Sequence, residues 1–272
     1  MKSFLSFLLV PVCAFANFVS GDFLYWRAAQ EELIIGYTDT VVQPDFSWNP
    51  GFRTGIGYEF YDGIEGALFY TQYESLGNSF DSEELAARGE WALKFRTLDA
   101  ELSKTYCFSP AVRLRPFIGL RGTLQEQDFS LETLREDDIL LQQLQTMKCR
   151  GVGIRGGLGT TWMLPCSVSL FSNVAVAAIW SELDNARTDL EDAEQISVIT
   201  RSTTTVDAAV DLQLGLQWQI DPDGWCGQAL LQVCWEEQVW INWGQMILLA
   251  DDLSRNGDLS LHGLTARLLA KF

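Results

Sequence analysis

Long stretches of this sequence alternate between apolar and polar or small residues, and this period of two constrains the fold more than any other feature. In residues 52–60 every even position is apolar or Thr, and every odd position is Gly or charged. Residues 206–218 and 152–164 repeat the pattern, with Gly, Ala, Asp or Gln on the less apolar face. Because successive side chains of a strand point to opposite faces, each stretch predicts a strand with one apolar side.

Such alternation occurs both in soluble β-sandwiches and in transmembrane barrels. Here the non-apolar face is rich in Gly, Ala and Gln, which suits a crowded lumen better than a solvated outer face. Five tryptophans fall near the expected strand ends, where a barrel has aromatic girdles: Trp91, Trp162, Trp180, Trp218 and Trp225. We therefore predict an all-β fold, a transmembrane antiparallel up-and-down β-barrel whose apolar faces contact outer-membrane lipid.

About ten strands (8–12) are expected, at 20–29, 50–61, 64–74, 91–106, 111–125, 150–164, 167–181, 203–219, 228–242 and 258–272. Short connections with turn residues, such as Asp62-Gly63, alternate with long ones near 30–49, 75–90, 126–149, 182–202 and 243–257. Short periplasmic turns and long extracellular loops are typical of outer-membrane barrels. Residues 131–147 also carry a helix-like apolar stripe, which predicts either a helix at the barrel mouth or a solvated excursion.

The two ends of the sequence predict export and membrane insertion. Lys2, the apolar residues 4–12 and the small residues of Ala14-Phe15-Ala16 indicate a signal peptide over 1–16, followed by a single barrel domain over 17–272. A lipoprotein processed at Cys13 is disfavoured, because the residues before it lack the small side chain that such processing needs. The last alternating segment ends at Phe272, a C-terminal signal of the kind that barrel-insertion machinery binds. The expected location is the outer membrane.

The net charge of −17 argues against a nucleic-acid partner, because phosphate neutralisation needs clustered Lys and Arg. The acidic runs 81–84 and 136–138 lie in expected loops and predict a solvated, self-repelling surface.

The alternation predicts which charged residues line the lumen: Arg53, Glu59, Asp99, Glu101, Arg113, Arg115, Arg121, Arg155, Asp207, Asp211, Glu236, Arg267 and Lys271. They predict either an electrostatic constriction that selects small solutes or an ion-pair network that fills a narrow barrel. Glu65, Lys94 and Arg96 do not fit this scheme, because strict alternation places them on or near the outward face.

Catalysis is not expected, and neither a metal nor another cofactor is predicted. The one histidine, His262, shares its face with the lipid-side residues Leu264 and Leu268. The sequence contains no Gly-x-Ser-x-Gly motif and no metal-spaced His/Cys set.

Five cysteines follow the expected signal peptide. Cys107, Cys166 and Cys226 fall in expected periplasmic turns, Cys149 at the edge of an outer loop, and Cys234 in a strand facing the lumen. An odd number in an exported protein leaves three alternatives: free thiols, one internal bridge, or intermolecular disulfides with other envelope proteins.

Several short motifs resemble the Legionella-type major outer membrane protein family, also called MOMP-like. They are residues 22–26 (DFLYW), 114–122 (LRPFIGLRG), 235–240 (WEEQVW) and 259–265 (LSLHGLT), which together span most of the mature chain. Related proteins occur in Legionella, in Chlamydia-like bacteria and in Planctomycetes. The resemblance implies a pore-forming outer-membrane barrel, and the cross-linked envelopes of Chlamydia-like bacteria favour intermolecular disulfides.

Two functions follow. The first is a porin-like passive channel for small solutes. The alternative is a structural or adhesive surface barrel with a sealed lumen, disulfide-linked to other envelope proteins. A barrel of about ten strands is narrow for a general porin, which favours the alternative, whereas the family resemblance favours the channel. The channel is the function that we predict.

Overall fold

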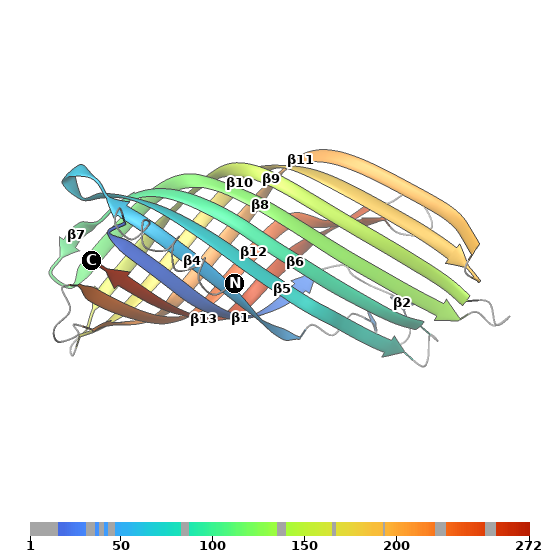
Figure 1. The fold of residues 1–272 in the computed structure, drawn as a ribbon, viewed down its shortest axis with the longest axis horizontal. Coiled ribbons are helices and arrows are strands. Elements are labelled where there is room, and N and C mark those ends of the chain that lie inside the picture. Colours follow the sequence, from blue (N-terminus) through green and yellow to red (C-terminus); the bar gives the residue numbers. More distant parts are fainter. Residues whose placement is uncertain are drawn as a thin grey trace, which may run out of the picture.

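The computed structural model describes residues 16–30, 36–37, 41–42, 47–82, 87–134, 140–164, 167–192, 194–220, 227–247 and 254–272. Ten long antiparallel strands form one closed, tilted barrel (Figure 1). They are β1 (Phe18–Gln30), β4 (Trp48–Glu59), β5 (Ile64–Ser82), β6 (Ala87–Lys104), β8 (Val112–Leu134), β9 (Leu140–Met163), β10 (Val168–Glu191), β11 (Glu194–Ile220), β12 (Gln228–Ile247) and β13 (Ser254–Lys271). Each strand pairs with the next in this order, and β13 pairs with β1 to close the ring. The predicted fold class and strand number are confirmed.

Strand β1 begins and strand β13 ends at the same end of the barrel, where Phe18 lies opposite Lys271. The turn from β4 to β5 at this end is a short 3-10 segment, Tyr61–Gly63, in which Asp62 and Gly63 have φ of 64° and 73°. An Asp-Gly pair suits this backbone because both residues tolerate positive φ. Lys104 donates a hydrogen bond of 2.6 Å to Asp62, which lowers the pKa of that carboxyl group. A short strand, β7 (Tyr106–Ser109), lies in the turn before β8.

At the opposite end the strands run well beyond the predicted bounds. Strands β5 and β6 extend through 75–82 and 87–90, β8 and β9 through 126–134 and 140–149, and β10 and β11 through 182–191 and 194–202. The predicted long loops were therefore wrong for residues 75–82, 87–90, 126–134, 140–149, 182–191 and 194–202, whereas 83–86, 135–139 and 193 lie outside the described residues. The helix predicted over 131–147 was also wrong for 131–134 and 140–147, which are strand. Between β1 and β4, the short strands β2 (Gly36–Tyr37) and β3 (Val41–Val42) pair with each other.

The apolar and polar faces of the wall exchange sides along a single strand. In the half of β6 near the termini, Leu98 and Leu102 point outward and are more than half exposed, whereas Asp99 and Glu101 are buried inside. Further along, the inward residues are Trp91, Leu93 and Phe95, and the outward residues are charged except for Ala92. The first part has the pattern of a membrane-spanning barrel wall. The second has the pattern of a soluble barrel standing in water.

This exchange explains the missed strand extensions and one misplaced tryptophan. Trp91 was predicted to be a girdle residue, but it is fully buried inside the barrel. Trp180, by contrast, is 66 % exposed on the outer wall, directly below the outward Glu182. Among the described residues no helix is long and apolar enough to cross a membrane.

Candidate functional site: the barrel interior

A first group of buried ion pairs, the first ion cluster, joins β1, β4, β12 and β13. Arg53 donates a 2.7 Å hydrogen bond to Glu236 and lies 3.4 Å from Asp22. Arg267 makes two hydrogen bonds of 2.8 Å to the same Asp22 carboxylate. Thr265 donates to the other Glu236 oxygen at 2.9 Å. The carboxylate oxygens of this cluster are thus bound by several donors, as buried charges require.

The second ion cluster is centred on Arg121 of β8. Its guanidinium makes two hydrogen bonds to Asp99, at 2.7 and 2.9 Å, and two to Asp211, at 3.0 and 2.8 Å. Arg155 binds the same Asp211 at 2.9 and 3.0 Å and also pairs with Glu101. Bidentate arginine–carboxylate geometry of this kind fixes both partners in place.

Arg115 extends the second ion cluster toward the terminal end of the barrel. It lies 3.7 Å from Glu101 and 3.1 Å from Glu65. Across both clusters five arginines face six carboxylates. We call this set the charged layer.

Some of the ion pairs join neighbouring strands, such as Asp22 with Arg267 and Asp99 with Arg121, whereas others reach across part of the lumen. Arg53 of β4 and Glu236 of β12 are three strands apart in the ring, as are Arg121 of β8 and Asp211 of β11. The space left between the clusters is a polar cavity of about 60 Å³. A cavity of this size has room for only a few water molecules.

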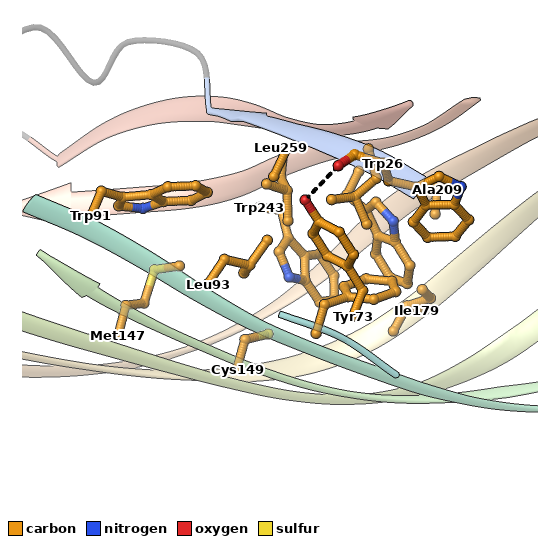
Figure 2. Close-up of a cluster of buried hydrophobic side chains, with 14 of the residues drawn as sticks. Trp26, Tyr73, Trp91, Leu93, Met147, Cys149, Ile179, Ala209, Trp243 and Leu259 are labelled. Atoms are coloured by element: carbon orange, nitrogen blue, oxygen red, sulfur yellow. Dashed lines mark hydrogen bonds between the residues drawn. The ribbon is translucent and has the colours of Figure 1, made fainter. Parts of the chain in front are cut away.

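Above the charged layer, away from the termini, the interior is packed with large apolar side chains that we call the apolar layer. The residues involved are Leu24, Trp26, Tyr73, Trp91, Leu93, Phe95, Trp240, Trp243, Leu259 and Leu261, all fully buried. Figure 2 labels six of them, Trp26, Tyr73, Trp91, Leu93, Trp243 and Leu259, and shows that they come from several strands. The hydroxyl group of Tyr73 donates a 3.0 Å hydrogen bond to the carbonyl oxygen of Trp26.

One contact in the apolar layer spans the full width of the barrel. The rings of Phe95 on β6 and Trp240 on β12 lie edge to face with centroids 5.3 Å apart. These strands are five positions apart in a ring of ten, so they are diametrically opposed. The Arg121 guanidinium lies over the Trp240 ring, 5.4 Å from its centroid. The charged and apolar layers therefore touch at Trp240.

The structure places the predicted lumen residues in three locations. Nine lie in the charged layer: Arg53, Asp99, Glu101, Arg115, Arg121, Arg155, Asp211, Glu236 and Arg267. Glu59, Arg113 and Lys271 are on the inward face but beyond the packed interior, at the terminal mouth, where Glu59 and Arg113 are exposed and Lys271 lies 3.5 Å from Glu59. Asp207 is buried apart from the charged layer and accepts hydrogen bonds from Ser181 and Thr205.

Sequence reasoning misplaced Glu65 and missed Asp22. Glu65 shares its inward face with Ala67 and Thr71, so the structure corrects its outward placement. Asp22 lies on a strand whose two faces are both rich in apolar residues, so alternation did not show whether its side chain points inward or outward. Lys94 and Arg96 do lie on the outer face, as strict alternation requires.

The histidine and the described cysteines occupy different environments. His262 lies on the outer wall in an aromatic group, with ring centroids 6.0 Å from Trp48 and 6.1 Å from Trp235. Cys107 is exposed in β7, and Cys234 is buried inside the barrel. Cys149 is also buried inside, on β9, because that strand continues through the segment predicted to be a loop. Cys166 and Cys226 lie outside the described residues.

A closed ten-stranded antiparallel barrel with an apolar outer band and a charged interior defines a transmembrane β-barrel protein of the outer membrane. The sequence profile of the family described as "Legionella pneumophila major outer membrane protein precursor" matches residues 9–272. The chain belongs to this family, as the sequence motifs indicated.

Other comparisons give more distant likenesses. No curated protein matches the chain significantly. Among solved structures, the outer membrane protease OmpT from Escherichia coli aligns with a TM-score of 0.49 at 11 % identity, covering 94 % of this chain and 97 % of that one. A major outer membrane protein from Thermus thermophilus gives a TM-score of 0.40 at 11 % identity, covering 94 % and 99 %. Neisserial surface protein A gives 0.35 at 11 % identity, covering 94 % and 96 %. Likenesses this weak carry no argument about activity.

Proposed function

We propose that this outer-membrane protein is a closed-lumen barrel with a structural or adhesive role at the cell surface. The observation that carries the proposal is the contact between Phe95 and Trp240, which joins opposite walls of the barrel at a centroid distance of 5.3 Å. A passive channel needs a continuous aqueous path. Two aromatic rings in van der Waals contact across the full diameter leave none between them.

The charged layer supports the same conclusion by a second mechanism. Most of its arginines and carboxylates pair at 2.7–3.0 Å, some along the wall and some across part of the lumen, and the cavity between them has a volume of only about 60 Å³. Opening this layer would break hydrogen bonds between charged groups, each of which typically contributes about 1.5–3 kcal/mol. Part of the barrel also stands beyond the apolar band with a polar outer face, as a surface domain would.

A porin-like channel for small solutes is the second candidate. The observation that favours it is the polar cavity itself, lined by charges of both signs at the level of the membrane band. Conduction would require both the ion pairs and the aromatic contact to separate. The charged layer would then act as a selective constriction.

Planar-bilayer recording distinguishes the two candidates. We expect folded wild-type protein to insert without ion conductance. The variant Phe95→Ala/Arg121→Ala/Trp240→Ala removes three side chains that meet across the lumen and is expected to give stepwise conductance. The matched control, Arg150→Ala/Trp180→Ala, truncates exposed residues of the outer wall and should stay silent. Steady conductance from the wild type would refute the closed lumen and favour the channel.

We also infer that the protein has no catalytic role and that its partners are membrane and envelope components. The inference on catalysis is supported by the place of His262 on the outer wall, among aromatic rings rather than beside a nucleophile. Exposed Cys107 at the terminal end is a candidate for a disulfide with a periplasmic or neighbouring envelope protein. Export by a signal peptide over 1–16 and recognition of Phe272 by the insertion machinery belong to the same proposal.

A further inference from the structure

Four basic side chains gather on the outer wall, on the two strands that flank β8. Arg96 and Arg150 both lie opposite Leu124 of β8, and Lys94 and Lys148 both lie opposite Glu126. Two strand spacings and two residues along a strand give a patch of about 10 by 7 Å. We call these four cations the basic patch. They belong to a chain that has only 19 Lys and Arg against 36 Asp and Glu.

The cations of the basic patch are held loosely. Lys94 and Lys148 share Glu126 at 3.8 and 3.9 Å, whereas the charged layer inside the barrel pairs at 2.7–3.0 Å. The arginines reach Glu74 and Asp184 at 3.9 and 3.7 Å. All four side chains are roughly half exposed, between 46 and 64 %. Exposed pairs of this kind contribute little, so the cations remain available to another anion.

The basic patch borders the membrane band directly. The next outward-facing residue after Arg96 on the side of the termini is Leu98, and the next after Arg150 is Val152. Both side chains are more than half exposed. Leu124 lies between the two arginines and is itself 53 % exposed. A ligand at this boundary would meet cations at one end and an apolar surface at the other. A soluble anion could contact the cations but has no apolar part to contact the apolar surface.

The position of the basic patch along the barrel indicates which membrane leaflet it faces. In outer-membrane barrels the chain ends and the short turns face the periplasm. The basic patch lies toward the opposite end of the barrel from Phe18 and Lys271, and therefore at the outer leaflet. The outer leaflet of this membrane contains phosphorylated, multiply acylated glucosamine lipids of the lipid A type.

We propose that the basic patch binds the phosphate groups of such a glycolipid, with its acyl chains against Leu98, Leu124 and Val152. Arginine guanidinium groups match phosphate oxygens in a bidentate geometry, and the lysines add point charges. Glu126, at the centre of the patch, can accept hydrogen bonds from sugar hydroxyl groups. This inference does not depend on whether the lumen is closed.

Lipid binding to the purified, detergent-folded protein tests the proposal by native mass spectrometry. The probes are bisphosphorylated lipid A, lipid A without phosphates, and inorganic phosphate as competitor. We expect bisphosphorylated lipid A to bind the wild type, and Arg96→Gln/Arg150→Gln to weaken it by about tenfold or more, because charge-assisted hydrogen bonds are lost. The matched control, Lys104→Gln/Arg113→Gln, removes two cations at the terminal end and should bind as the wild type does.

Three results would overturn the proposal. The first is equal affinity of the wild type and Arg96→Gln/Arg150→Gln. The second is equally tight binding of lipid A without phosphates, which would mean that acyl chains alone drive association. The third is full displacement of lipid A by millimolar inorganic phosphate, which would identify a general anion site instead.

Discussion

Replacing Arg121 by Met should destabilise the barrel more than almost any other single substitution of a charged residue. The side chain is 2 % exposed and donates four hydrogen bonds of 2.7–3.0 Å, two to Asp99 and two to Asp211. Met keeps much of the length of the side chain but none of its charge. Arg155 still compensates Asp211 in the variant, whereas Asp99 loses the cation that binds both of its oxygens.

The magnitude follows from leaving a buried carboxylate without its cation. Removing one partner of a buried ion pair typically costs about 3–5 kcal/mol. At about 1.4 kcal/mol for each factor of ten, the unfolding equilibrium should shift by roughly two to three and a half orders of magnitude. The double variant Asp99→Asn/Arg121→Met removes the orphaned charge and should recover a substantial part of this loss.

Urea unfolding in detergent micelles or lipid vesicles, followed by tryptophan fluorescence, measures these changes. The matched control is Arg150→Met, which breaks a 3.7 Å pair at a 64 % exposed side chain and should cost less than about 1 kcal/mol. If Arg121→Met lost no more stability than this control, the charged layer would have to be hydrated. That result would contradict its description as a packed seal and would favour the channel.

Two further predictions concern glycine packing and cysteine accessibility. A β-carbon at Gly157 would lie 2.5 Å from the Phe117 ring and 2.3 Å from the Val174 carbonyl oxygen, so Gly157→Ala should cost about 1–3 kcal/mol in the same unfolding assay. The control is Gly21→Ala, because a β-carbon there would have no other atom within 4 Å, and it should leave the free energy of unfolding unchanged. Equal losses of stability in the two variants would contradict this packing. In the folded barrel, a maleimide should modify Cys107 quickly and the buried Cys149 and Cys234 only after unfolding, as peptide mass spectrometry can show. Rapid labelling of Cys234 would indicate an open interior, and absence of any reducible higher band on non-reducing gels of whole envelopes would contradict an intermolecular disulfide.

Local alternation predicted the side of the wall to which most charges point. Arg53, Arg121, Arg155 and Glu236 have inward positions because strand geometry assigns successive residues to opposite faces, whatever the rest of the chain does. Alternation gave a wrong prediction where the apolar residues change from the outer to the inner face of the wall. Inside the membrane band the apolar residues point outward, whereas beyond it they point inward, so Trp91 looked like a lipid-facing girdle residue.

That exchange of faces was itself legible in the sequence. The run from Trp91 to Glu101 changes the odd positions from apolar to acidic without any change of period. Trp91 therefore shares its face with Asp99, and an inward Asp99 requires an inward Trp91. The strand extensions were not predicted for the same reason, because their polar outer face gives a sequence that resembles a loop.

The alternating sequence by itself thus determined a ten-stranded outer-membrane barrel and the side of the wall on which most charges lie. Only the tertiary structure decided that Phe95 and Trp240 meet across the lumen, because the level at which each ring lies depends on the stagger accumulated over five strand pairings on either side. It also decided which charges meet. Asp22 binds Arg267 at 2.8 Å across 245 residues of sequence, a neighbour relation that exists only once β13 has paired with β1.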